Sequence, residues 1–96
     1  MQSANFTWLL MPRDGHSRLG ITASKRMGNA VQRNRIKRVL KEVFRRHIDI
    51  FPKHCDIVVI PRRSSQGLGY AEVLVEAQNT SARMHRKLVP TRQEPA

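Results

Sequence analysis

The period of the hydrophobic pattern changes near residue 29, and this change most constrains how the chain can fold. Before it, residues 5–11 and 18–24 alternate between two sets of side chains, which is typical of strands. After it, apolar residues recur at helical spacing and form a stripe that must face a core: Ile36, Val39, Leu40, Val43, Phe44 and Phe51. Asn29 is a favourable N-cap, so we expect this helix to begin at Ala30 and to end at or before Pro52.

The remaining chain supplies one more strand and one more helix. Residues 56–61 contain an apolar run without alternation, which indicates a strand covered on both faces. A second helix is expected from Tyr70, and its inward stripe would hold Tyr70, Val73, Leu74, Ala77, Met84 and Leu88. The turn chemistry of residues 12–15 predicts that the first two strands pair as a hairpin.

We therefore predict one domain, residues 1–96, of the α+β class. The element order is strand, strand, helix, strand, helix, and both amphipathic helices need a sheet to cover them. The expected architecture is a small α-β sandwich, in which a mixed sheet of three to four strands carries the helices on one face. The core should span about residues 5–88, and residues 89–96 should form a flexible C-terminal tail.

The positive charge is concentrated in one part of the chain. The formal net charge is +11, and residues 18–46 hold ten Lys and Arg against a single acid, Glu42. These like charges repel one another, and binding of a polyanion relieves the repulsion. Arg33 and Arg35 fall in the first two helical turns, where backbone N–H groups and the helix dipole also favour phosphate. A solvated helix face is the alternative, but Glu42 is the only nearby acid that could pair with these cations.

The composition disfavours several other classes of protein. No apolar run is long enough for a transmembrane helix, and the first five residues lack the layout of a secretory signal. The single Cys55 fits a reducing cytoplasm, and we interpret it as a small, half-buried residue beside a strand. The histidines and Cys55 lack the spacing of zinc ligands, so we predict no metal site in the protein. Scattered acids (Asp49, Asp56, Glu72, Glu76) disfavour a self-sufficient nuclease.

Residues 18–38, RLGITASKRMGNAVQRNRIKR, closely resemble the signature of the bacterial ribonuclease P protein subunit. Gly-Asn-Ala-Val followed by Arg-Asn-Arg and Lys-Arg is the specific part of this match, and a looser similarity continues through residues 56–62 and 70–72. The resemblance covers about residues 6–77. It implies a left-handed β-α-β crossover formed by residues 19–24, the helix from Ala30 and residues 56–61, as in a ribosomal-protein RNA-binding domain.

The resemblance also implies a function. Members of the family join a catalytic RNA to form ribonuclease P, a ribonucleoprotein endoribonuclease that hydrolyses precursor tRNA, removes its 5′ leader and leaves a 5′-phosphate. Catalysis and the magnesium ions are expected to belong to the RNA, with no catalytic residue and no cofactor in the protein. The implied partners are this RNA and the precursor tRNA leader, in the cytoplasm, with neither a membrane nor a small-molecule substrate.

Two RNA-binding surfaces are implied. The first would contact the catalytic RNA through Lys25, Arg26, Asn29, Arg33, Asn34, Arg35, Lys37, Arg38, Lys41 and Arg45. The second would be the sheet face away from the helices, a cleft for the single-stranded leader formed by Thr7, Leu9, Gly20, Thr22 and Ser24, although an ordinary exposed sheet face is an equal alternative. Family members usually carry another helix and strand before the position of Phe6, so we do not expect that helix's aromatic residues here.

The main rival hypothesis is a non-catalytic, structural RNA-binding module of the ribosomal type. Such a module would have the same composition and the same basic surface as a ribonuclease P subunit. Only the long motif in residues 18–38 separates the two hypotheses.

Overall fold

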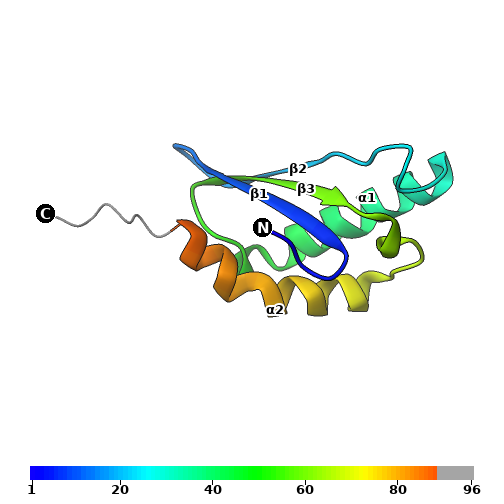
Figure 1. Ribbon diagram of the computed structural model, residues 1–96. Helices are drawn as coiled ribbons and strands as arrows, with labels where there is room; N and C mark the ends of the chain where they lie inside the picture. Colours follow the sequence, from blue (N-terminus) through cyan, green and yellow to red (C-terminus); the bar gives the residue numbers. More distant parts are fainter. Residues whose placement is uncertain (89–96) are drawn as a thin grey trace, which may run out of the picture.

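A three-stranded mixed sheet carries both long helices on one of its faces (Figure 1). The computed structural model describes residues 1–88, and the predicted tail of residues 89–96 lies outside the described residues. The strands and helices are β1 (Phe6–Pro12), β2 (Arg18–Ile21), α1 (Ala30–Arg46), β3 (Cys55–Pro61) and α2 (Tyr70–Leu88), with short 3₁₀ helices at Ile48–Ile50 and Arg63–Ser65. The predicted α+β class, the mixed sheet and the order of the elements are confirmed.

β3 lies between the other two strands, so the predicted hairpin of β1 and β2 is wrong. β1 pairs antiparallel to β3, and β2 pairs parallel to β3. The backbone N–H of Arg13 donates to the carbonyl of His54, directly before β3, at 3.0 Å. The connection from β1 to β2 therefore passes over the start of β3 instead of folding back on itself. Parallel neighbours need a crossover connection, and α1 supplies it.

β3 is buried on one face only, contrary to the prediction of a strand covered on both. The face toward the helices is buried and consists of Cys55, Ile57, Val59 and Pro61. Val58 and Ile60 on the other face are half-buried, and their neighbours across β1 are Leu9 and Thr7. An uninterrupted apolar run thus arises here without a second layer of helices, because partly exposed apolar residues alternate with fully buried ones.

The core fills the space between the sheet and the two helices. Phe6 and Trp8 of β1 point into it, with their ring centroids 5.7 Å apart in an edge-to-face arrangement. Phe51 packs beside Trp8, but it follows the 3₁₀ helix at Ile48–Ile50 and so does not belong to the stripe of α1. Cys55 is fully buried rather than half-buried, and this burial raises the pKa of its thiol. The inward stripe of α2 is confirmed by the buried Val73, Ala77 and Met84.

A capping box fixes the start of α1, as the N-cap prediction for Asn29 requires. The Asn29 side chain accepts a hydrogen bond from the backbone N–H of Gln32 at 2.8 Å, and the Gln32 side chain accepts one from the backbone N–H of Asn29 at 2.9 Å. Gly28 leaves the space that this exchange needs, because a Cβ atom at that position would overlap Oε1 of Gln32. At the other end, α1 stops at Arg46 and His47 is its C-cap.

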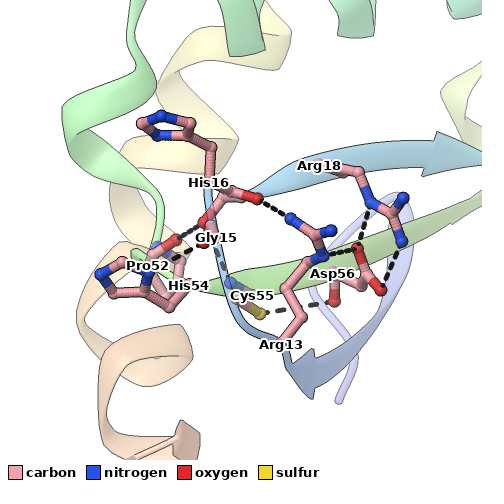
Figure 2. Close-up of polar contacts among 9 residues, drawn as sticks. Arg13, Gly15, His16, Arg18, Pro52, His54, Cys55 and Asp56 are labelled. Atoms are coloured by element: carbon pink, nitrogen blue, oxygen red, sulfur yellow. Dashed lines mark hydrogen bonds and ion pairs between the residues drawn. The ribbon is translucent and has the colours of Figure 1, made fainter.

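An ion cluster fastens the connection between β1 and β2, and the first residue of β2, to the start of β3 (Figure 2). Arg18 donates from Nε and Nη2 to the two carboxylate oxygens of Asp56, at 2.9 and 3.1 Å, and Nε of Arg13 lies 3.4 Å from the same carboxylate. The hydrogen bond from Arg18 is the main reason why the pKa of Asp56 lies below its usual value. Nearby, Ser17 donates to the carbonyl of Pro52 and accepts from the N–H of Cys55.

Replacing Asn29 with Ala should lower the free energy of unfolding by about 1 kcal/mol, because the backbone N–H of Gln32 then loses its acceptor. The matched control is Asn79→Ala at an exposed position inside α2, which should change stability by less than about 0.5 kcal/mol. Urea unfolding followed by circular dichroism measures both variants. An equal loss in the two variants would show that the cap does not hold the helix start.

Removing the charge of Asp56 should weaken the dependence of the protein's stability on pH in the acidic range. A depressed folded-state pKa gives stability that is present above the unfolded-state pKa of about 3.9 and is lost as the pH falls through the folded-state pKa. Asp56→Asn should therefore be less stable than the parent at pH 7, and should lose less stability on acidification below about pH 4. Thermal unfolding across this range measures the effect, with Asp14→Asn, an exposed acid of the same connection, as the control. Parallel profiles for Asp56→Asn and the parent would contradict the role of the cluster.

Candidate nucleic-acid interface

Exposed cations cover the start of α1 and the turn before it. Residues 25–27 form this turn, which lies between the end of β2 and the start of α1. The apolar stripe of α1 faces the core through Ile36, Leu40 and Val43, so the polar residues of the opposite face point into solvent. We define the basic surface as the exposed members of the predicted set in this region: Lys25, Arg26, Asn34, Arg35, Arg38 and Lys41.

The remaining predicted RNA-binding side chains are engaged within the fold or lie apart from this surface. Arg33 is half-buried and donates to the carbonyl of Gly28 at 2.7 Å, while Asn29 serves as the N-cap. Lys37 is half-buried on the flank of the helix. Arg45 lies about 22 Å from Ala30 along α1 and donates to Glu42 at 2.7 Å.

The electrostatics of α1 differ between its two ends. The first turn contains no acid, so nothing there offsets the positive end of the helix dipole. Toward the last turn, Glu42 pairs with Arg45 and Arg46, and the hydrogen bond from Arg45 is the largest cause of its lowered pKa. Unneutralised positive charge therefore gathers at the start of the helix, where backbone N–H groups also favour an anion.

The sheet face away from the helices is open and partly apolar. Pairing across the strands places Leu9, Val58 and Gly20 in one row, and Met11, Asp56 and Arg18 in the next. The side chains of Leu9 and Met11 are 44% and 48% exposed. Because Gly20 has no side chain, a hollow of about 340 Å³ lies beside it, lined by Met11, Arg18, Leu19, Gly20, Asp56, Ile57 and Val58.

The five residues predicted for the leader cleft fall into two groups. Thr7, Leu9 and Gly20 lie together on the open sheet face. Thr22 and Ser24 are exposed, but β2 ends at Ile21 instead of reaching residue 24, so both belong to the segment that leads into α1. This segment connects the open sheet face to the basic surface.

Two arginines that the sequence interpretation did not assign to a site lie beside these surfaces. β2 and β3 are parallel, so the residues that follow each strand meet at one edge of the sheet. A hollow of about 420 Å³ lies there, lined by Ser24, Arg26, Met27, Ile60, Pro61, Arg62 and Arg63. Arg62 is half-buried and donates to Thr7 at 3.2 Å and to the carbonyl of Ala4 at 2.7 Å, whereas Arg63 is exposed. The β-α-β crossover implied by the family resemblance was the signal that could have indicated this site, because it places the ends of both strands at one edge.

The arrangement is suited to binding a polyanion. Within residues 1–88, no three His, Cys, Asp or Glu side chains gather as metal ligands would. None of the helices in this part of the chain is both long and apolar enough to cross a membrane. Arginine predominates in the basic surface and around the hollow of Arg26 and Arg63, and its planar guanidinium binds phosphate through two parallel hydrogen bonds.

Comparison with known proteins gives one consistent family. The family model described as Ribonuclease P matches residues 1–85. The ribonuclease P protein component of Finegoldia magna is 38% identical over 69 residues, which cover 72% of this chain and 61% of the relative. That of Syntrophus aciditrophicus is 48% identical over 59 residues, which cover 62% of this chain and 50% of the relative. The chain therefore spans about half to three fifths of the length of these curated relatives.

Solved structures agree with the sequence matches. The RNase P protein of Thermotoga maritima superposes with a TM-score of 0.77 at 34% identity, over 86% of this chain and 80% of that one. The RNase P protein of Staphylococcus aureus gives a TM-score of 0.67 at 30% identity, over 91% of this chain and 77% of that one.

Proposed function

The chain belongs to the ribonuclease P protein family, and we propose that it is the protein subunit of this enzyme. In this function it binds the catalytic RNA and assists removal of the 5′ leader from precursor tRNA. The observation that carries the proposal is the basic surface, because the residues of the family motif gather there at a helix start that holds no acid.

We propose that the catalytic RNA docks on the basic surface. Arg35 and Arg38 lie one turn apart on the exposed face of α1, so their guanidinium groups can grip neighbouring phosphates. Asn34 lies beside them, and its amide can both donate to and accept from a base edge or a 2′-hydroxyl group. Lys25 and Arg26 extend the same field into the turn before the helix.

We propose that the leader of the precursor tRNA crosses the open sheet face. Leu9 and Met11 offer apolar contact area to bases, and Gly20 leaves room for the chain. Arg26 and Arg63 line the hollow at the edge where β2 and β3 end, next to the start of α1. A phosphate held there would lie between the RNA on the basic surface and the leader on the sheet.

Catalysis is assigned to the RNA, together with the magnesium ions. The acids within residues 1–88 support this assignment because they are dispersed, and several of them bind other groups of the chain. Asp56 is held by Arg18, and Glu76 accepts hydrogen bonds from Ser3 and Asn5. The protein's contribution is to reduce the repulsion between two polyanions, the catalytic RNA and the precursor tRNA. We place the complex in the cytoplasm, where a free buried thiol such as that of Cys55 is ordinary.

A reconstitution assay tests this function. Added to a bacterial ribonuclease P RNA at low magnesium concentration, the protein should stimulate cleavage of a precursor tRNA, because its cations replace part of the screening that magnesium provides. The protein without the RNA should cleave nothing. Binding of the RNA without any stimulation would favour the ribosomal-type structural module, and cleavage by the protein alone would overturn the assignment of catalysis to the RNA.

Substitutions in the basic surface should change how strongly salt weakens RNA binding. Arg35→Ala and Arg38→Ala should each reduce the log-log salt slope by about 0.7 to 0.9, because each removes one phosphate contact. Arg86→Ala, at an exposed position near the end of α2, is the control and should leave the slope unchanged. Filter binding at several salt concentrations measures the slopes. Arg33 is less suitable for this test, since its half-buried side chain donates to the carbonyl of Gly28 at 2.7 Å, whereas Arg35 is exposed and makes only a longer contact, 3.3 Å, to the carbonyl of Leu68.

A further inference from the structure

Val31, in the first turn of α1, is 75% exposed, which makes it the most exposed large apolar residue that the structure describes. Residues three and four positions apart share a helix face, so Val31 lies on the same face as Asn34 and Arg35. It therefore stands within the basic surface and points away from the core stripe of Ile36 and Leu40. Ala30 beside it is exposed as well.

The free protein gains little from a valine at this position. A side chain that is 75% exposed buries almost no apolar area, and branching at Cβ makes valine a poorer helix former than alanine. The Val31 side chain does not belong to the hydrophobic core or to the partly buried residues packed against it. Its methyl groups can contribute to stability only when something else covers them.

We propose that Val31 is an apolar contact for an unstacked base of the catalytic RNA. This inference rests on the proposed function and adds a contact that is not electrostatic. The surrounding Arg35, Arg38 and Lys41 select a polyanion over an apolar protein surface as the occupant. The major groove of a paired A-form helix is too deep and narrow for side chains, whereas an unstacked base presents both an apolar face and a polar edge.

The helix geometry provides for both features of such a base. Val31 covers part of the apolar face, and Asn34, one turn further along the same side of α1, reaches the polar edge. Arg35 donates to the carbonyl of Leu68 through Nη1 at 3.3 Å, and its other N–H groups can take a phosphate next to the base. Base recognition and phosphate binding would thus be adjacent on one helix face.

An apolar contact is distinguished from a phosphate contact by its dependence on salt. Releasing counterions from phosphate makes affinity fall with salt concentration, but covering methyl groups releases none. Val31→Ala should therefore weaken binding by the same factor at every salt concentration, about three- to tenfold for the two carbon atoms removed. The slope of the log-log plot should stay that of the parent.

The experiment compares Val31→Ala with Val75→Ala, a substitution of the same chemistry at a 52% exposed position in α2. Affinity for a bacterial ribonuclease P RNA is measured at several salt concentrations, together with the melting temperature. Val31→Ala should melt at or above the temperature of the parent and bind more weakly with an unchanged slope, while Val75→Ala should bind as the parent does. Val31→Thr, which replaces one methyl with a hydroxyl in the same shape, should also lose affinity.

Each other outcome has a definite meaning. Parent-like affinity of Val31→Ala, a changed slope, or full affinity of Val31→Thr would overturn the apolar contact and leave the proposed function standing, provided that the parent binds with a steep salt dependence. A parent protein without salt-dependent binding of this RNA would overturn the proposed function and the inference together.

Discussion

The parallel pairing of β2 with β3 is the constraint on which the other features depend. Parallel neighbours cannot be joined by a tight turn, so the chain must cross over, and α1 is that crossover. The helix consequently begins close to the sheet edge where β2 ends, and the segment after β3 emerges at the same edge. This single pairing brings three sets of cations together: Lys25 and Arg26 in the turn, Arg35 and Arg38 on the helix, and Arg63 after β3.

The acids of the protein and the cations of the basic surface lie in different parts of the structure. Its acids largely act within the chain: Asp56 holds Arg18 and Arg13, Glu42 holds Arg45 and Arg46, and Glu76 accepts hydrogen bonds from the first residues of the chain. The start of α1 has no such acid, so its cations remain available to a partner. The net charge of +11 therefore understates the local field, because neutralisation occurs mainly away from the basic surface.

Local features of the structure were predictable from the residue pattern, whereas the pairing of β2 with β3 across α1 was implied only by the family resemblance. The N-cap at Asn29, the start of α2 at Tyr70 and the inward stripe of α1 depend on neighbouring residues, and they are confirmed. The hairpin failed because β1 pairs instead with β3, whose residues lie 43 to 55 positions further along the chain. For the candidate site, the sequence indicated the cations of the surface, but it could not show that Arg33 turns back to Gly28 or that Arg63 joins Arg26.

A sheet with helices on only one face leaves its other face uncovered by any element within residues 1–88. Until a partner arrives, Leu9 and Met11 remain in contact with water and the cations of α1 repel one another. Under the proposed function, the catalytic RNA would relieve the repulsion and the leader would cover Leu9 and Met11, so both ligands should stabilise the fold. Protein bound to RNA should then resist proteolysis better than free protein, because binding lowers the population of unfolded chains.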